Sequence, residues 1–257
     1  MIITTSLRTT EQITEKAKKV ATELGLRFIE RNQQPIPLII KHYQRDVLVV
    51  GSNRLTVYQQ GNLEPFFFHP NSAMFRVKRF LRGETDPFLE ATKLAKNMSI
   101  LDCTLGLASD SILSSVVVGK NGQVIGLEAS PYLAYIVSEG LHCWKTGLAE
   151  VDDAMQRMTV THCNHLEYLR SAKENSFDVV YFDPMFEVKI DSSDGISPLR
   201  KLALYDRLKE EAVEEAKRVA KHRVVLKDHW QSTRFSRFNF FVYKRVTSLF
   251  HYGSIEL

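Results

Sequence analysis

The segment 100–110, which reads Ile-Leu-Asp-Cys-Thr-Leu-Gly-Leu-Ala-Ser-Asp, constrains the fold of this chain more than any other. An apolar run leads into Asp102, a turn of small residues around Gly106 follows, and a helical pattern begins after it. A second apolar run, 123–127, ends in Glu128. The spacing between Gly106 and Glu128 is typical of a mononucleotide-binding βαβ unit, in which the acid after the second strand binds ribose hydroxyls. This segment therefore predicts an α/β fold with a nucleotide site after its first strand.

From residue 98 onward, apolar strand patterns alternate with helical patterns, which indicates a mostly parallel sheet covered by helices. The predicted strands are 98–102, 124–128, 158–163, 177–183 and 223–227, and the predicted helices are 109–118, 131–140, 166–174 and 199–221. The β-branched and aromatic run 240–252 contains no helix, so we expect a terminal antiparallel pair. The predicted fold is therefore an α/β domain whose sheet is mostly parallel with an antiparallel last strand.

The N-terminal part of the chain follows a different pattern and predicts a small α+β module. Residues 11–24 carry apolar side chains on one helical face, and β-rich runs follow at 37–43, 47–50 and 54–58. The aromatic run 65–71, bounded by prolines, is expected to pack between this module and the domain that follows it. We therefore divide the chain into a module at 1–71, a candidate for substrate recognition, and a domain at 72–257.

Composition limits the class of protein. The chain has 257 residues, 44% of them hydrophobic, which is enough for one large domain and a smaller appendage. Its three cysteines lack zinc or redox spacing, so we expect a reduced, cytoplasmic protein without a bound metal. No apolar run approaches the ~20 residues that cross a bilayer, and no membrane association is expected. The sequence leaves open whether the protein is a monomer or a homodimer.

Charge is distributed unevenly along the chain. The net charge is +4 overall, but +6 over residues 1–96 and +7 over residues 217–257, which leaves −9 between them. Basic ends around an acidic centre indicate a polyanionic partner. On the helix predicted after residue 72, Arg76 and Arg79 lie with Lys78 or Arg82 on adjoining parts of the surface. We predict that Arg76 and Arg79 contact phosphate groups of a nucleic acid.

The loop after the first predicted strand indicates which nucleotide the site binds. A dinucleotide site would need a Gly-x-Gly-x-x-Gly turn, whereas this loop has one glycine, Gly106, and two carboxylates, Asp102 and Asp110. Carboxylates repel a pyrophosphate but attract a sulfonium and an ammonium group, so the predicted ligand is S-adenosylmethionine. Glu128 would then bind the ribose, and Asn164, after the next strand, would lie beside the adenine.

The loop after the strand 177–183 carries the predicted methyl acceptor site. It reads Asp183-Pro184-Met185-Phe186 and resembles the Asp-Pro-Pro-Tyr element of amino-directed nucleic-acid methyltransferases, with Met185 in place of the second proline. In that chemistry the aspartate and the next backbone carbonyl accept hydrogen bonds from an exocyclic amine, while the aromatic ring stacks on the base. We therefore assign Asp183, Pro184 and Phe186 to catalysis.

These motifs together resemble the bacterial small-subunit ribosomal RNA guanine-N2 methyltransferase family, over roughly residues 72–230. The resemblance implies a class I, Rossmann-like fold, S-adenosylmethionine as cofactor, and ribosomal RNA or a small-subunit particle as partner. The full set of predicted cofactor-binding residues is Asp102, Thr104, Gly106, Ser109, Asp110, Glu128, Ala129, Asn164, His165 and Asp183, and the predicted substrate-binding residues are Arg76, Arg79, Met185 and Lys227.

The chain also departs from this family. The family tends to have Gly-Arg before the second loop acid, where this chain has Ala108-Ser109, and an arginine after the ribose acid, where it has Ala129. The segment 187–194 is more acidic than the family pattern. These departures leave the cofactor assignment in place and leave the target nucleotide open.

Other functions compatible with the sequence are a small-molecule or protein methyltransferase on the same fold and a non-catalytic RNA-binding assembly factor. Carbon-5 pyrimidine methylation would require a nucleophilic cysteine in the loop at Asp183, and none is present there. In the C-terminal tail, the segment 230–237 either lines the substrate entrance or covers the sheet edge, and covering is the favoured interpretation.

Overall fold

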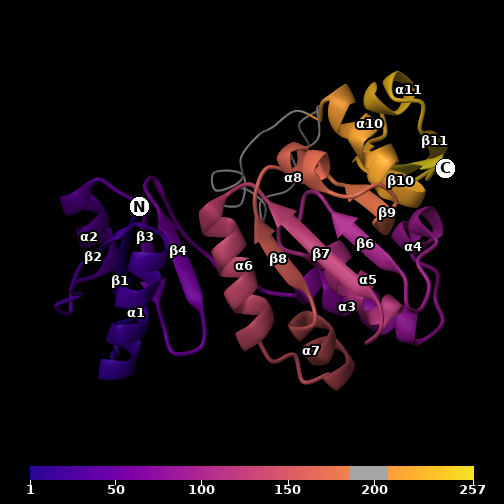
Figure 1. The fold of residues 1–257 in the computed structure, drawn as a ribbon. Helices are drawn as coiled ribbons and strands as arrows, with labels where there is room; N and C mark the ends of the chain where they lie inside the picture. Colours follow the sequence, from indigo (N-terminus) through magenta and orange to yellow (C-terminus); the bar gives the residue numbers. More distant parts are fainter. Residues whose placement is uncertain (186–207) are drawn as a thin grey trace.

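The computed structural model describes residues 1–185 and 208–257, which contain two β-sheets (Figure 1). The larger sheet has seven strands in the order β11-β12-β10-β9-β6-β7-β8. Strands β6 to β10 run parallel to one another, and β12 is antiparallel to both β10 and β11. These strands are β6 (Ser99–Asp102), β7 (Gln123–Glu128), β8 (Thr159–His162), β9 (Phe177–Phe182), β10 (Ala220–His229), β11 (Phe241–Tyr243) and β12 (Phe250–Glu256). The predicted α/β class with an antiparallel last strand is confirmed.

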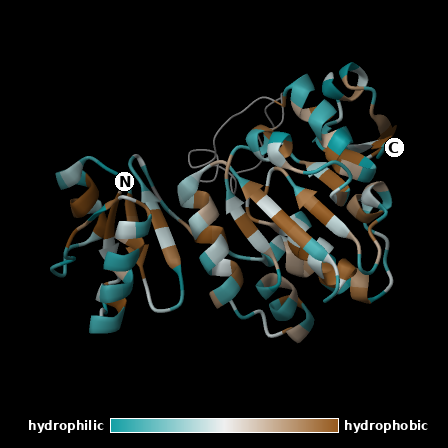
Figure 2. Cartoon of the chain, viewed as in Figure 1, coloured by the Kyte–Doolittle hydropathy of each residue, from teal (hydrophilic) through white to brown (hydrophobic). Residues whose placement is uncertain are grey.

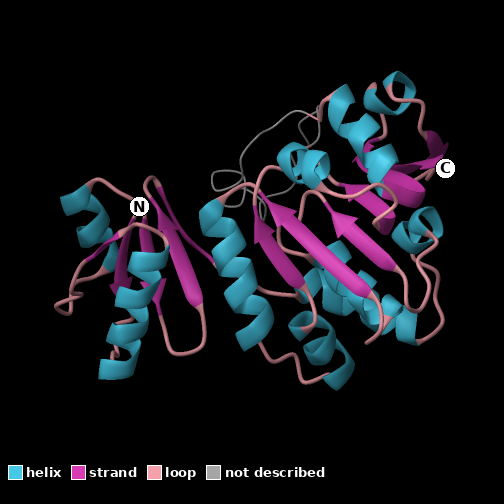
Figure 3. Cartoon of the chain, viewed as in Figure 1, coloured by secondary structure: helices cyan, strands magenta, loops and turns pink. Residues whose placement is uncertain are grey.

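Helices cover both faces of this sheet because its central strands are apolar on both sides. In β6, Ile100 packs in a core cluster with helices α5 and α6, whereas Leu101 packs in a second cluster with α8 and α10. The same alternation places Val179 and Val180 of β9 in opposite clusters. The helices of this domain are α3 (Asn71–Leu81), α4 (Pro87–Thr92), α5 (Ser109–Val118), α6 (Pro131–Cys143), α7 (Ala149–Gln156), α8 (His165–Ser171), α10 (Glu210–Val219) and α11 (Arg234–Arg237). Figures 2 and 3 show the apolar strands between the two helical layers.

Most predicted elements of this domain occur with the predicted type, and three differ. Helices α7 and α11 were not predicted from the sequence. The predicted helix at 199–221 is α10, and its last two residues instead begin strand β10 at Ala220. Residues 199–207 of that prediction lie outside the described residues. No helix in the described ranges is long and apolar enough to cross a membrane.

The N-terminal module contains a five-stranded mixed sheet in the order β2-β1-β3-β4-β5. Its elements are β1 (Ile2–Thr5), α1 (Glu11–Glu23), β2 (Arg27–Phe28), α2 (Ile36–Tyr43), β3 (Val47–Val50), β4 (Leu55–Gln59) and β5 (Asn62–Phe66). Helix α1 begins as predicted, because the Thr10 hydroxyl accepts a hydrogen bond from the Ile13 N–H group at 3.3 Å. The predicted small α+β module is therefore confirmed.

The strand predicted at 37–43 is wrong, because this segment forms helix α2. Its buried residues are Ile36, Ile39 and Ile40, a spacing that places them on one face of a helix. The prediction followed the β-propensity of isoleucine, but the helical spacing of the buried side chains decides the structure. Strand β1 was missed because Thr4 and Thr5, which look polar in sequence, are buried.

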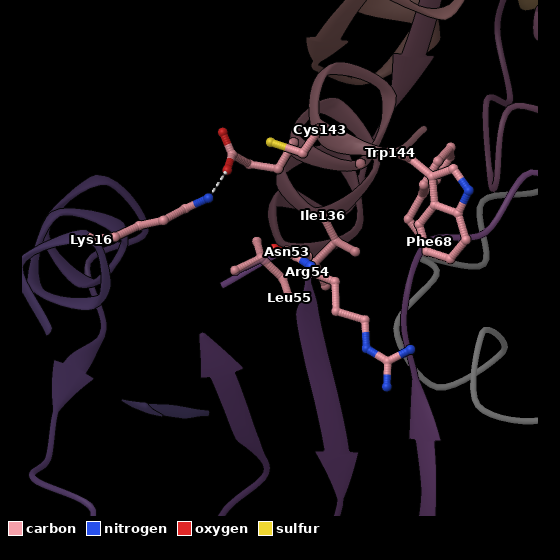
Figure 4. Close-up of a pocket in the computed structure, with 10 residues that line it drawn as sticks. Lys16, Asn53, Arg54, Leu55, Phe68, Ile136, Cys143 and Trp144 are labelled. Atoms are coloured by element: carbon pink, nitrogen blue, oxygen red, sulfur yellow. Dashed lines mark ion pairs between the residues drawn. The ribbon is translucent and has the colours of Figure 1, made fainter. Parts of the chain in front are cut away.

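The module contacts the larger domain along helix α6 (Figure 4). Phe68 lies against Gly140, where a Cβ atom would come within 2.3 Å of the phenyl ring, so only glycine permits this contact. Lys16 of α1 pairs with Glu139 of α6 at 2.8 Å. Phe66 and Phe68 are buried, and the aromatic run fills the junction as predicted. One core cluster includes residues from both parts, and the division at residue 71 stays a prediction.

Candidate active site

Loops after four parallel strands meet at the carboxyl edge of the sheet and are hydrogen-bonded to one another. The Gly106 N–H group donates to the Glu128 carboxylate at 3.2 Å, and the Cys163 N–H group donates to the Glu128 carbonyl at 3.1 Å. The Asp183 N–H group donates to the Thr104 hydroxyl at 2.6 Å. The loops after β6, β7, β8 and β9, which carry the predicted cofactor and catalytic residues, therefore form one continuous site.

The turn after β6 contains two residues with left-handed backbone conformations. Gly106 has a φ of 50° and Ala108, which precedes α5, has a φ of 61°. A left-handed conformation costs a residue with a Cβ atom about 1 kcal/mol, whereas glycine adopts it freely. Ala108 stands where the resembling family tends to have glycine, so this departure keeps the shape of the turn at the cost of local strain. Ser109 begins α5 directly after this turn.

Glu128 is held in place by backbone groups at the end of β7. Its carboxylate accepts hydrogen bonds from the Ser130 N–H group at 2.9 Å and from the Gly106 N–H group at 3.2 Å. Burial raises the pKa of Glu128, and these donors oppose that effect. A carboxylate offers about four acceptor positions, so further positions remain for a pair of hydroxyl groups. The remaining acceptor positions at Glu128 therefore fit the ribose hydroxyls of a nucleoside cofactor.

Asp102, at the end of β6, is the most buried acid of the first loop. Its carboxylate accepts hydrogen bonds from the Thr104 N–H group at 3.0 Å and from the Ser111 hydroxyl. Burial raises the pKa of Asp102 to about 7; the nearby Asp110 and Asp183 act in the same direction, whereas these hydrogen bonds oppose the rise. The site therefore holds Asp102 near the midpoint of its titration at neutral pH.

This raised pKa predicts a pH dependence of stability. The unfolded-state pKa of an aspartate is about 3.9, so between roughly pH 4 and pH 7 the folded protein binds the Asp102 proton more tightly than the unfolded chain. This group therefore lowers the free energy of unfolding as pH rises through that window, by up to about 1.4 kcal/mol per pH unit. Urea unfolding of the wild type and of Asp102→Asn should show a stability difference that changes across this window and levels off above it. A pH-independent difference would contradict the assignment.

Asp183 lies in a partly buried pair with Lys227 of β10. The Lys227 Nζ atom donates to Asp183 Oδ2 at 2.7 Å and lies 3.6 Å from Asp110 Oδ2. Burial raises the pKa of Asp183, although Lys227 opposes this effect. For Asp110, Lys227 and Arg76 outweigh the effect of burial and lower its pKa. The pKa of Lys227 is raised because Asp183 and Asp110 outweigh its desolvation. Lys227 thus joins Asp183, the predicted catalytic acid, to Asp110 in the predicted cofactor loop.

Arg76 is not available to a phosphate group, which corrects its predicted role. Its guanidinium donates to Asp86 at 2.9 Å through two nitrogens and to Asp110 through the third, and only 19% of its side chain is exposed. Arg76 therefore anchors α3 to the start of α5. Arg79 is 42% exposed and pairs with Glu84 at 2.6 Å, so its predicted phosphate contact stays a prediction.

The predicted adenine-side residues lie next to Glu128. Asn164 caps helix α8, since its side-chain oxygen accepts a hydrogen bond from the Leu166 N–H group at 2.9 Å. His165 contacts the ring of Phe182 edge-on at 5.8 Å. The carbonyl of Ala129 lies 3.2 Å from the His162 ring. The structure brings these loops together at the expected strand ends, and their contacts with adenine stay predictions.

The C-terminal tail covers the sheet next to the predicted catalytic loop. Arg234 is buried, pairs with Asp228 at 2.9 Å and donates to the Met185 carbonyl at 3.3 Å. Phe235 is buried in the core cluster beneath α10. The favoured interpretation, that this segment covers the sheet edge, fits both residues. Pro184 is described next to Asp183, whereas Phe186 lies outside the described residues.

Some residues of the site were missed by sequence analysis. The Tyr181 hydroxyl donates to Asp110 at 3.0 Å, and Asp86 holds Arg76. Tyr181 lies in an apolar strand run and is indistinguishable there from a core aromatic residue, so no sequence pattern could have revealed it.

The strand order of the larger sheet, with its antiparallel β12, is that of the class I methyltransferases. The model of the family described as "Putative SAM-dependent methyltransferase" matches residues 32–236, and the chain belongs to this family. Membership implies S-adenosylmethionine as the methyl donor.

Individual relatives agree with this assignment. The chain is 48% identical over 255 residues to "Uncharacterized protein YpiP" of Bacillus subtilis (strain 168), covering 99% of each chain. It is 27% identical to "Ribosomal RNA small subunit methyltransferase J" of Buchnera aphidicola subsp. Schizaphis graminum, covering 73% of this chain and 78% of the relative. A crystal structure of a SAM-dependent methyltransferase from Neisseria gonorrhoeae matches with a TM-score of 0.66 at 17% identity, covering 100% of this chain and 96% of that one, which shows the fold. The family resemblance seen in the sequence is therefore confirmed.

Proposed function

We propose that this methyltransferase modifies the exocyclic amine of a nucleic-acid base, namely N2 of a guanine in small-subunit ribosomal RNA. The observation that carries the proposal is the position of Asp183-Pro184-Met185 at the end of β9. Asp183 is hydrogen-bonded to Thr104 in the loop after β6, and that loop is in turn hydrogen-bonded to Glu128 at the end of β7. The homology to proteins named small-subunit ribosomal RNA methyltransferase J supports the choice of substrate. The basic ends of the chain are consistent with a polyanionic partner.

The proposed chemistry depends mostly on positioning the exocyclic amine relative to the methyl group of the cofactor. S-adenosylmethionine, when bound, supplies an electrophilic methyl group. The Asp183 carboxylate and the Pro184 carbonyl would each accept a hydrogen bond from the amine, which orients its lone pair. Since burial raises the pKa of Asp183, this carboxylate is also suited to accept the proton that the amine must lose. Lys227 fixes the carboxylate through its Oδ2 atom.

The cofactor contacts are part of the same proposal. Glu128 would bind the ribose diol, Asn164 and His165 would lie beside the adenine, and the turn containing Gly106 would lie along the methionine part. The carboxylate of Asp110 is already paired with Arg76 and Lys227, so we assign it to holding these cations rather than to the ammonium group.

The proposal is tested by mapping methylated nucleosides. Ribosomal RNA from cells that lack this protein should lose one N2-methylguanosine of the small subunit, as measured by mass spectrometry, and the wild-type gene should restore it. The purified protein should transfer a labelled methyl group to ribosomal RNA or small-subunit particles from the deletion strain. Unchanged ribosomal RNA together with methylation of a small molecule or protein would overturn the proposal.

A further inference from the structure

We propose that Trp230 and the turn 244–249 between β11 and β12 form a surface that binds single-stranded RNA beside the target base. We call these residues, together with Phe250, the hairpin platform. The inference deepens the proposed function and rests on it for the identity of the neighbouring catalytic site.

Strand register places the platform at the catalytic edge of the sheet. Leu226 of β10 is paired with Phe182 of β9, so Lys227 is level with Asp183. Further along β10, His229 is paired with Phe250, the first residue of β12. The platform therefore projects beyond the strand ends from which the Asp183 loop also leaves.

Side-chain contacts connect the platform to the predicted catalytic residue. The Lys227 Nζ atom that lies 2.7 Å from Asp183 also lies 5.0 Å from the centre of the Phe250 ring. The Arg245 guanidinium lies 4.8 Å from the centre of the same ring. The backbone N–H group of Trp230 donates to the backbone carbonyl of Leu249 at 3.1 Å, which joins this residue to the turn. Lys227 thus connects the platform to Asp183.

The exposed side chains of the platform are of the types that bind single-stranded nucleic acid. Trp230 is 50% exposed, Leu249 is 51% exposed and Val246 is fully exposed. Exposed apolar groups of this size are not explained by packing within the described residues. Lys244 and Arg245 accompany them, and residues 229–255 contain no aspartate or glutamate. An exposed aromatic ring accompanied by cations is the arrangement that stacks bases and pairs phosphates.

The first test uses Trp230 as a reporter. The protein has two tryptophans, Trp144 and Trp230, so the variant Trp144→Phe leaves only the platform indole. A single-stranded RNA oligonucleotide should quench its fluorescence because a base stacks on the indole, and the quenching midpoint should move to higher RNA concentration as salt rises. A duplex of the same sequence should quench less at equal concentration. The proposal is overturned if the oligonucleotide binds, as measured by anisotropy, without changing this emission, or if it does not bind at all.

The second test compares matched variants with the complete chain. Trp230→Leu should weaken affinity for the oligonucleotide about tenfold, which is the loss expected for one base stack. Arg245→Gln should reduce the salt dependence of oligonucleotide binding by an amount that corresponds to about one phosphate contact. Phe241→Leu is the control, because Phe241 is 69% exposed on the same hairpin but is paired with Ser254, nearer the opposite edge of the sheet. On ribosomal RNA, Trp230→Leu should raise KM with little change in kcat.

The outcomes separate this inference from the proposed function. If the wild type methylates ribosomal RNA while Trp230→Leu leaves both affinity and KM unchanged, the platform is refuted and the function stands. If RNA quenches Trp230 but is never methylated, the platform stands and the proposed function fails. Equal effects of Trp230→Leu and Phe241→Leu would indicate a general change of the hairpin and overturn the inference.

Discussion

Replacing Asp183 by alanine should lower kcat for methyl transfer about 100-fold or more, because the amine then loses the acceptor that orients its lone pair. The fold should persist, since Lys227 keeps Asp110 as a partner 3.6 Å away. Asp183→Asn should fall between the wild type and alanine, because the amide retains an oxygen acceptor but lacks the charge. Single-turnover assays with labelled S-adenosylmethionine measure this effect apart from product release.

A matched control distinguishes positioning of the amine from binding of the cofactor. Glu128→Gln should weaken S-adenosylmethionine binding about tenfold, because charge-assisted hydrogen bonds to the ribose are lost. Asp183→Ala should leave cofactor affinity and RNA affinity within a few-fold of the wild type. Full turnover by the alanine variant would refute the assigned role of Asp183.

Replacing Lys227 by methionine should have the second large effect, on both stability and the pH profile. The substitution keeps most of the side-chain volume but leaves the partly buried Asp183 without its cation, whereas the buried Asp110 keeps Arg76. Because the pair with Asp183 is only partly buried, its loss should cost between about 1 and about 3 kcal/mol of stability. Since Lys227 lowers the pKa of Asp183, its loss should raise that pKa further. The acid limb of the kcat–pH profile should therefore move to higher pH.

The stability loss should also depend on pH. Protonation of Asp183 removes its uncompensated charge, so the deficit of Lys227→Met should be larger at pH 8 than at pH 5. Lys221→Met is a suitable control on the same strand, because its partner Asp178 lies at 3.2 Å and the lysine side chain is 42% exposed. Such an exposed pair contributes about 1 kcal/mol or less. An unchanged pH profile in Lys227→Met would show that this lysine does not set the ionisation of Asp183.

Strand and helix periodicity predicted most of the larger domain, because strands buried on both faces and helices with apolar faces leave local patterns. The predicted and observed bounds of α5 coincide at residues 109–118. Within the N-terminal module the prediction from residue type and spacing failed at α2, which combines β-branched residues with helical spacing. Residue type and spacing conflict there, and packing of Ile36, Ile39 and Ile40 into the core decides between them.

The order of the loops along the chain was enough to predict a shared site, since the carboxyl ends of parallel strands lie at one edge of a sheet. It was not enough to assign roles to individual charges. Arg76 looked like a surface cation, yet it is inserted between Asp86 and Asp110.

Local sequence therefore determined the fold class, the cofactor loops and the family resemblance, because each depends on spacing within a short stretch of chain. Charge pairing depended on the folded protein, since Arg76, Asp110, Asp183 and Lys227 are distant in sequence and meet only when the sheet forms. The loop after β6 shows both contributions, that of the local sequence and that of the tertiary structure. Its acids were visible in the sequence, while the burial that raises the pKa of Asp102 and the cations that lower that of Asp110 come from tertiary packing.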